Sequence, residues 1–442
     1  MRSRLVLAIL LLLPHLAAAD GLTVLTVGKV AVFRNGRGTV RVGRDPRLAS
    51  PAPPTCPTAS GIELSSYPVA TQRVVVTTKV ELDCARWKKK GGGFAYDDPL
   101  ANGGVRAIRY GRKGLLIRFE GSQPTGPVGY LQAWVTVGST RFNARFHNFA
   151  RNEAGALVTR KPSRAAATGE QAFWAVLHRD WSTSAQKADL EAAALDSLTR
   201  AAKRDKRDGW SRFLLAMTHL YRFAQATERY DQISGFARGE IEAAHASFRD
   251  ALPLVWSGTV GDSRVPGFAA ASTFVLGVVR GDPALQAQGL VELDAAFQLN
   301  PFFNVFDYIP VTQALPAFDP RFQGVFDKVS GYLSDPDTLQ CVVTQPEICN
   351  DFGYAPRNTP GSLALFGDVD AKGGNVDGAE MWYGLALALA RGGSPPYPFL
   401  PALELRTTTV AERIALFRDA DPGNDPSVIG TGPEACAACH NR

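Results

Sequence analysis

Two cysteines and a histidine lie together near the end of the chain, in the run Cys436-Ala437-Ala438-Cys439-His440. Two residues between the cysteines, followed at once by histidine, put two sulfur atoms and an imidazole on one helical turn. Such a group can close a short disulfide loop, supply part of a zinc site, or hold a flat prosthetic group through both sulfurs. A zinc site would need a fourth ligand, which the neighbouring sequence lacks.

This run resembles the haem-attachment motif of c-type cytochromes. The resemblance implies that Cys436 and Cys439 form thioethers to haem c and that His440 is an axial ligand of the haem iron. Because only two residues follow His440, a sixth ligand must come from upstream, from another protein, or be absent. The internal candidates are Met217, Met381, His147, His178, His219 and His245. For both methionines, packing in a helical core is the simpler explanation.

The N-terminus has the composition of a secretory signal. Arg2 and Arg4 precede an apolar run at residues 5–13, and three small residues end at Ala19. We therefore expect a signal peptide at 1–19, cleaved after Ala19, and a periplasmic or secreted protein. Haem c is attached outside the cytoplasm, so export agrees with the C-terminal motif. No later stretch is apolar for long enough to span a bilayer, so we expect no transmembrane segment in the mature chain.

The four remaining cysteines form two pairs along the chain. Cys56 and Cys84 lie in the N-terminal part, whereas Cys341 and Cys349 bracket a short loop. In an oxidising compartment these pairs are the simplest disulfide candidates.

Composition indicates a folded protein without a nucleic-acid partner. Hydrophobic residues make up 45% and charged residues 20% of the chain, as in ordinary globular domains. The formal net charge of +6 falls to +4 once Arg2 and Arg4 leave with the signal. The densest basic runs, at residues 88–90 and 203–207, adjoin glycine or aspartate and contain no interleaved aromatic residues, which favours solvated loops.

Residues 20–150 are predicted to form a β-sandwich or a small barrel. Short runs rich in valine and threonine alternate there with glycine, proline and aspartate. The expected strands are 23–33, 39–42, 73–82, 105–110, 115–119, 130–137 and 141–146, with a two-residue hairpin connection between the last two. Trp87, residues 92–97 and residues 105–119 together resemble an uncharacterised β-module of large secreted bacterial proteins.

After a predicted linker at 151–167, apolar residues recur at helical spacing. Trp210, Phe213, Leu214 and Met217 fall on one face of a helix. We therefore expect an α-helical domain at 168–418. Helix-breaking aspartate and proline residues from Asp419 then begin a C-terminal tail, 419–442, which carries the haem motif.

Two helix pairs in this domain resemble tetratricopeptide repeats, which place small residues where paired helices cross. The matching positions are Leu276, Gly277, Gly289, Leu293, Ala296 and Pro301 in one pair, and Phe366, Gly367, Ala379, Tyr383 and Ala386 in the other. Arg280 and Asp370 replace an aromatic position of the family. The resemblance implies tetratricopeptide-like helical hairpins, so the expected fold is multidomain, β followed by α, with a short haem-binding tail.

These features predict an exported scaffold that carries haem c and transfers electrons, with another exported redox or scaffold protein as its partner. The sequence has no P-loop, nucleophile elbow, metalloprotease helix or dinucleotide fingerprint, so a non-enzymatic role is expected. Two alternatives stay open. One is an interaction scaffold whose terminal cysteines form a disulfide without haem; the other is a haem enzyme with an open sixth position.

Overall fold

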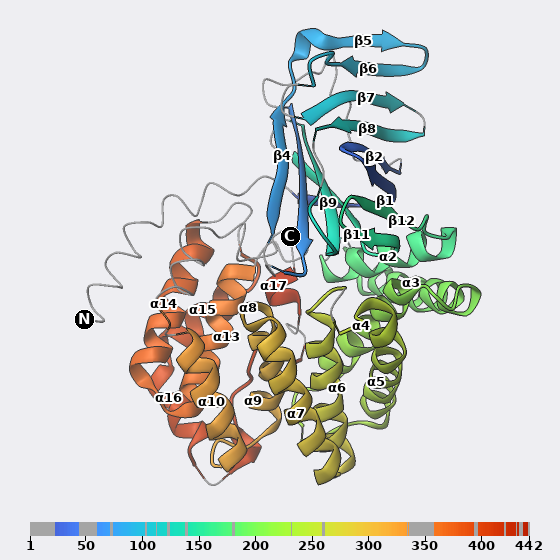
Figure 1. The fold of residues 1–442 in the computed structure, drawn as a ribbon. Helices are drawn as coiled ribbons and strands as arrows, with labels where there is room; N and C mark the ends of the chain where they lie inside the picture. Colours follow the sequence, from blue (N-terminus) through green and yellow to red (C-terminus); the bar gives the residue numbers. More distant parts are fainter. Residues whose placement is uncertain are drawn as a thin grey trace.

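Strands and helices occupy successive parts of the chain. The computed structural model describes residues 23–43, 60–70, 74–101, 104–111, 113–121, 124–137, 140–178, 182–230, 232–258, 261–333, 335, 358–392, 397–419, 421–429, 431–432 and 436–440. Strands extend to Thr159 and helices follow from Arg164; Figure 1 shows the strands above the helices. The predicted order, β followed by α, is confirmed. The signal expected at 1–19, together with Cys56, Cys341 and Cys349, lies outside the described residues.

The strands form one continuously hydrogen-bonded system. They are β1 (Thr23–Arg34), β2 (Arg37–Val42), β3 (Ser60–Pro68), β4 (Val75–Glu81), β5 (Trp87–Lys90), β6 (Gly93–Asp97), β7 (Val105–Gly111), β8 (Gly114–Glu120), β9 (Val128–Val137), β10 (Thr140–Phe146), β11 (Phe149–Glu153) and β12 (Ala156–Thr159). Their order is β4-β3-β9-β10-β1-β2-β8-β7-β6-β5, and β12 pairs with both β1 and β11. Neighbours are antiparallel except β1 and β10, which are parallel.

Strand β1 connects two ladders. Its first residues pair with β10, and the residues from Gly28 onward pair with β2, with a register shift between Gly28 and Val30. Both ladders contribute to one hydrophobic core: Phe33 and Ile117 come from one, Ile62 and Phe142 from the other, and each is at most 2% exposed. Burial of these side chains therefore holds the two ladders together.

Each of the seven expected strands overlaps a strand of the structure, but the prediction missed others, among them β3, which lies between β4 and β9. Residues 60–68 contain three serines, a glycine and a proline, which are poor strand formers. Partner strands on both sides stabilise β3 instead, and buried Ser65 accepts a hydrogen bond from Gln132 Nε2 at 2.8 Å. The expected two-residue hairpin is confirmed by the pairing of Val137 with Thr140.

The linker predicted at 151–167 is wrong. Residues in this range belong to β11 and β12 and to the first turn of helix α2 (Arg164–Leu177). Leu157 is 1% exposed and Val158 pairs with Val32 of β1. The pattern was misleading because the partner of β12 lies more than one hundred residues earlier in the chain.

The helices form a series of neighbouring pairs. They are α2, α3 (Ser184–Arg204), α4 (Gly209–Ala226), α5 (Gly235–Val255), α6 (Val265–Arg280), α7 (Pro283–Leu299), α8 (Pro301–Asn304), η4 (Val305–Tyr308), α9 (Ile309–Ala314), α10 (Pro320–Leu333), α13 (Asn358–Gly373), α14 (Val376–Gly392), α15 (Leu400–Thr408), α16 (Val410–Phe417) and α17 (Ala437–His440). Helices α2 and α3, α4 and α5, α6 and α7, and α13 and α14 pack pairwise (Figure 1).

Glycines allow two of these pairs to approach closely. A Cβ on Gly289 of α7 would lie 2.5 Å from the backbone nitrogen of Phe274 in α6. A Cβ on Gly367 of α13 would lie 2.5 Å from the ring of Tyr383 in α14. The small residues noted in the sequence therefore do lie at helix crossings.

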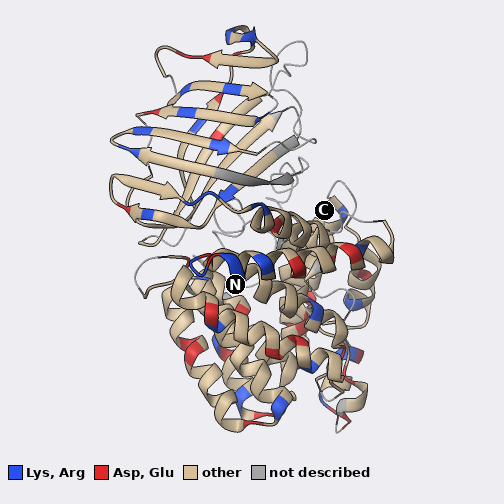
Figure 2. Cartoon of the chain, turned by 90° about the vertical axis from the view of Figure 1, so that its right-hand side faces the viewer, with Lys and Arg blue, Asp and Glu red and all other residues tan. Residues whose placement is uncertain are grey.

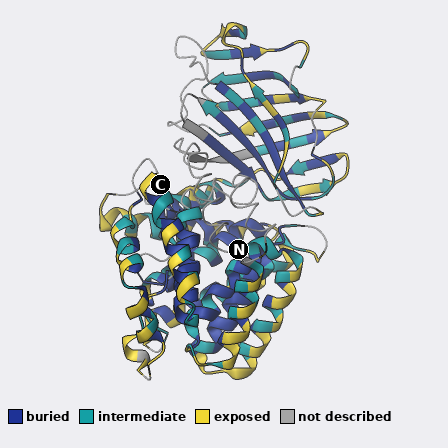
Figure 3. Cartoon of the chain, turned by 90° about the vertical axis from the view of Figure 1, so that its left-hand side faces the viewer, coloured by how far each residue is buried: buried dark blue, intermediate teal, exposed yellow. Residues whose placement is uncertain are grey.

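Buried residues line the inner faces of the helices and run along the strands, whereas exposed residues cover the outer helices (Figure 3). Figure 2 shows lysine and arginine interspersed with aspartate and glutamate over both regions. Within the described residues, no helix combines the length and the apolar character needed to cross a membrane.

Candidate functional site

The C-terminal motif forms the short helix α17. The backbone N–H groups of Cys439 and His440 donate to the carbonyl oxygen of Cys436, at 3.2 and 3.1 Å. The two cysteines and the histidine are thereby held on one turn, as their spacing predicts. Both thiols are free.

Helix α17 packs against the start of α13. A Cβ on Gly361 would lie 2.6 Å from the carbonyl oxygen of Ala438 and 2.7 Å from Cys439 Sγ, so a side chain at 361 would displace α17. The Tyr397 hydroxyl donates to the same Ala438 carbonyl at 3.0 Å. Ala438 is fully buried as a result.

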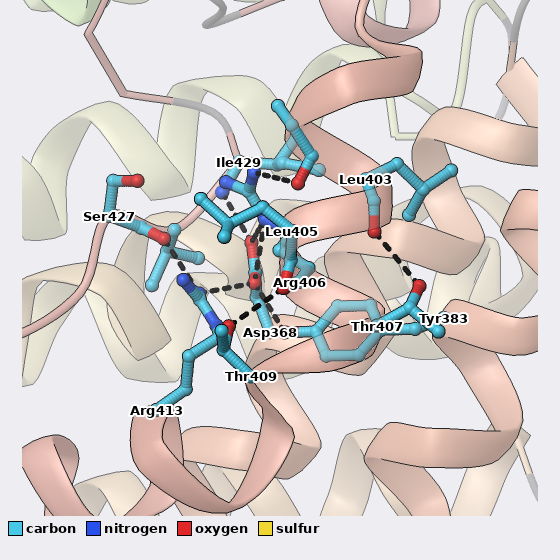
Figure 4. Close-up of polar contacts among 12 residues, drawn as sticks. Asp368, Tyr383, Leu403, Leu405, Arg406, Thr407, Thr409, Arg413, Ser427 and Ile429 are labelled. Atoms are coloured by element: carbon cyan, nitrogen blue, oxygen red, sulfur yellow. Dashed lines mark hydrogen bonds and ion pairs between the residues drawn. The ribbon is translucent and has the colours of Figure 1, made fainter.

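A buried aspartate anchors the segment that leads to α17 (Figure 4). The fully buried Asp368 carboxylate accepts hydrogen bonds from Tyr383 Oη at 2.6 Å, Arg413 Nη2 at 2.6 Å and Arg406 Nε at 3.1 Å. It also accepts from the backbone N–H of Ile429 at 2.8 Å. This last bond ties the tail directly to α13.

The tail continues across the helical region toward α4. Gln313 Nε2 donates to the Ile429 carbonyl at 2.7 Å, and the Gly432 N–H lies 2.9 Å from the carbonyl oxygens of both Ala224 and Thr227. Val428 and Ile429 are buried in the same core as the helices. The segment around Val428 and Ile429 is therefore packed into the helical domain.

The motif lies on the wall of a cavity of about 310 Å³ within the helical region. This volume falls within the range of roughly 300–1,000 Å³ found for small-molecule and cofactor sites. The described wall comprises Phe173, Trp174, Leu177, Trp210, Phe213, Leu214, Met217, Leu220, Phe223, Ala224, Tyr230, Asp262, Arg264, Val265, Phe268, Val275, Phe302, Phe303, Phe306, Ile309, Pro310, Gln313, Ser362, Leu365, Ile429, Cys436, Cys439 and His440. Aromatic and aliphatic side chains dominate it.

Burial affects the two thiols strongly. It raises the pKa of Cys436 to about 11 and that of Cys439 to about 12, although a hydrogen bond with Ser362 opposes the change at Cys439. At neutral pH both residues are therefore protonated. Because the thiolate is the reactive form, the cysteines of the folded protein should react slowly with soluble reagents.

An ion pair supplies most of the charge on the cavity wall. Arg264 donates from Nε and Nη2 to the two carboxylate oxygens of Asp262, at 2.8 and 2.6 Å. Both residues are buried, and the guanidinium lies 4.7 Å from the ring centre of Tyr130 in the β region. The pair therefore marks the side of the cavity nearest the strands.

A tryptophan lies close to the motif histidine, and a buried carboxyl group bonds another wall tryptophan. The ring centres of Trp174 and His440 are 6.3 Å apart. Glu170 accepts a hydrogen bond from Trp210 Nε1 at 3.2 Å, and burial raises the pKa of its carboxyl group to about 7. A group with a pKa near neutrality thus lies beside the wall residue Trp210. The sequence pattern did not single out Glu170, Asp262 or Arg264.

Of the six candidates for a sixth ligand, Met217 lies on the cavity wall. Met381 packs elsewhere in the helical core, on α14. The four histidines also lie outside the described wall. The ring centres of His147 and Trp210 are 3.4 Å apart, and His178 is the C-cap residue of α2. His219 Nδ1 lies 2.8 Å from Glu240, and His245 Nδ1 lies 3.4 Å from Ser272.

Of the disulfide candidates, Cys84 is disulfide-bonded. Its expected partner Cys56 lies outside the described residues, as do Cys341 and Cys349, so both pairings stay predictions.

The side chains on the wall suit a prosthetic group that is attached through two sulfur atoms, bound by an imidazole and surrounded by apolar surface. Two free cysteines and a histidine share one turn, and they open onto aromatic surface. The described residues contain no cluster of three or more histidine, cysteine or carboxylate side chains that could hold a bare metal ion. Comparison of the chain with protein-family models, curated proteins and solved structures finds no match.

Proposed function

We propose that the protein is an exported haem c protein that transfers electrons through a haem held at Cys436, Cys439 and His440. The observation that carries the proposal is the position of these three side chains on one turn at the wall of an aromatic cavity. A cysteine pair used only for a disulfide would not need such a cavity.

In this proposal Cys436 and Cys439 form the thioethers and His440 is an axial ligand. The bound haem supplies a one-electron couple. The apolar walls formed by residues such as Phe213, Leu214 and Phe306 exclude water. The Asp368 network and the contact of α17 with Gly361 hold the motif histidine in a fixed position.

The remaining parts of the chain are proposed to form a scaffold. The finer fold assignments are a β-sandwich for the strands and tetratricopeptide-like hairpins for the helices, supported by the shared core of two ladders and the glycine crossings. Arrays of helical hairpins offer extended surfaces for partner proteins, so we propose docking to an exported redox or scaffold protein. Export follows from the signal expected at 1–19, which directs the chain to the periplasm or outside the cell.

A pyridine haemochrome spectrum tests the cofactor. The full chain would be expressed with its signal in cells that mature c-type cytochromes, and extracted with acid–acetone to remove non-covalent haem. We expect haem to remain with the wild-type protein and to be lost from the Cys436→Ala, Cys439→Ala double variant. His440→Ala should lower haem content several-fold, whereas His219→Ala, a matched half-buried histidine away from the cavity, should retain it.

Absence of covalent haem from the wild type, while a control cytochrome matures in the same cells, would overturn the proposal. A disulfide-linked interaction scaffold would then be the better account. Thiol counting on unfolded protein would test that account, because Cys436 and Cys439 would react only after reduction.

A further inference from the structure

We infer that Met217 is the sixth ligand of the iron in this protein. The inference deepens the proposed function and rests on it, because it requires haem at Cys436 and Cys439. The sequence offers two methionines after Met1, and nothing in their local context distinguishes them as ligands. Their positions in the fold distinguish the two methionines.

The first step is the supply of donor atoms on the described wall. Apart from the motif, the side chains with an atom able to bind iron are those of Met217, Tyr230 and Asp262, with weak neutral donors at Gln313 and Ser362. The Met217 thioether is the soft donor found with histidine in electron-transfer haem proteins.

The oxygen donors on the wall are poorly suited to the role. Both carboxylate oxygens of Asp262 accept hydrogen bonds from Arg264. Burial raises the pKa of Tyr230, so its phenol stays protonated and lacks the charge that an oxygen ligand of iron(III) needs. Gln313 donates its amide to the Ile429 carbonyl.

The second step is position. Helix α17, which carries His440, rests on α13, whereas Met217 belongs to α4, which packs on α2, α3 and α5. The axial histidine and the methionine are therefore supplied by different helices around the cavity. Met217 also remains partly accessible, unlike its helix neighbours Ala216 and Thr218, which are buried.

The third step is the exclusion of the other candidates. Met381 belongs to α14 and is absent from the described wall. His147, between β10 and β11, stacks on Trp210, and His178 stacks on Trp174 with ring centres 5.6 Å apart. His219 pairs with Glu240, and His245 lies beside Ser272. None of these five residues belongs to the described wall, whereas Met217 does.

The test uses three variants of the full chain, matured with haem: Met217→Leu, Met217→His and the matched control Met381→Leu. Leucine is close in volume to methionine, so it should preserve the packing while removing the donor. We expect a low-spin wild type that binds carbon monoxide weakly when reduced. Met217→Leu should become high-spin and bind carbon monoxide at least one hundred-fold more tightly, and Met381→Leu should match the wild type.

Histidine at 217 provides a rescue that a merely structural role would not give. Met217→His should return the haem to the low-spin state with a lower midpoint potential than the wild type, because methionine ligation raises the potential. If neither variant at 217 folds, the reduced wild type decides the question. Its proton NMR spectrum should then contain the strongly shielded methyl resonance of an iron-bound methionine.

The outcomes separate this inference from the proposed function. Covalent haem with the same spin state in Met217→Leu and wild type would overturn the inference alone. So would a high-spin wild type, or a reduced wild type without the shielded methyl resonance; a high-spin wild type would favour a haem enzyme with an open position. Absence of covalent haem would overturn both.

Discussion

The Glu170→Gln substitution should make the protein more stable at high pH and leave its stability unchanged at low pH. Glu170 lies on α2 and accepts a hydrogen bond from Trp210 Nε1. Burial, opposed by this bond, raises the pKa of its carboxyl group from 4.5 to about 7. Glutamine keeps the shape and one acceptor oxygen but carries no charge.

The direction of the effect follows from proton binding. Below about pH 4.5 the carboxyl group is protonated in both the folded and the unfolded chain, so it resembles glutamine. As pH rises from 4.5 to 7, the unfolded chain releases its proton first and the folded protein loses stability. Above pH 7 the folded protein carries a poorly solvated carboxylate that the variant lacks.

The pKa shift sets an upper limit on the difference in free energy of unfolding between variant and wild type. A pKa of about 7 instead of 4.5 corresponds to about 3 kcal/mol, at about 1.4 kcal/mol per pH unit. Glu170 keeps part of its surface accessible, which reduces the effect through solvent screening. We therefore expect the variant to exceed the wild type by about 1–3 kcal/mol in free energy of unfolding at pH 8.

Urea unfolding followed by tryptophan fluorescence, at intervals from pH 4 to pH 8.5, would measure this difference. Glu242→Gln is the matched control, because Glu242 forms an exposed ion pair with Arg280 and should change stability by less than about 1 kcal/mol at every pH. A Glu170→Gln difference that does not vary with pH, or that decreases as pH rises, would refute the reasoning.

Three further predictions concern the docking of α17. Gly361→Ala should reduce haem retention several-fold in the haemochrome assay, because the added Cβ would press on α17. The control is Gly324→Ala on α10, where the added Cβ meets no atom within 4 Å, so haem retention should not change and the free energy of unfolding should stay the same or rise slightly. Asp368→Asn should destabilise the protein by about 3–5 kcal/mol in urea unfolding, because it leaves buried arginines without their carboxylate partner; an unchanged midpoint would contradict this. In haem-free, reduced protein, Cys436 and Cys439 should be alkylated at pH 8 at least ten-fold more slowly than in the Asp368→Asn variant. The reason is that burial raises the pKa of Cys436 to about 11 and that of Cys439 to about 12. Equal alkylation rates in the two proteins would show that α17 is not docked.

Local periodicity was enough to predict several parts of this protein. The helical spacing of Trp210, Phe213, Leu214 and Met217 identified α4 and its apolar face, because side chains three or four residues apart share a face of any helix. The spacing of the terminal motif likewise fixed its three side chains on one turn. These are properties of neighbouring residues, so a single sequence contains them.

Contacts between distant residues decided the rest. The apolar face of α4 lines a cavity as well as a core, which periodicity cannot distinguish because both surfaces are apolar. Strand β12 escaped prediction because Val158 and its strand partner Val32 are 126 residues apart. The tail joins the helical domain through a bond from Ile429 to Asp368, 61 residues earlier.

The distinction between Met217 and Met381 shows the same limit. The two side chains are chemically identical and both lie in helices that the sequence pattern located. Only the packing of α4 around the cavity brings Met217 to the wall that contains Cys436, Cys439 and His440. Residue type sets which chemistry is available, whereas tertiary packing sets which atoms meet, because helices far apart in the sequence are brought together by burial of their apolar faces.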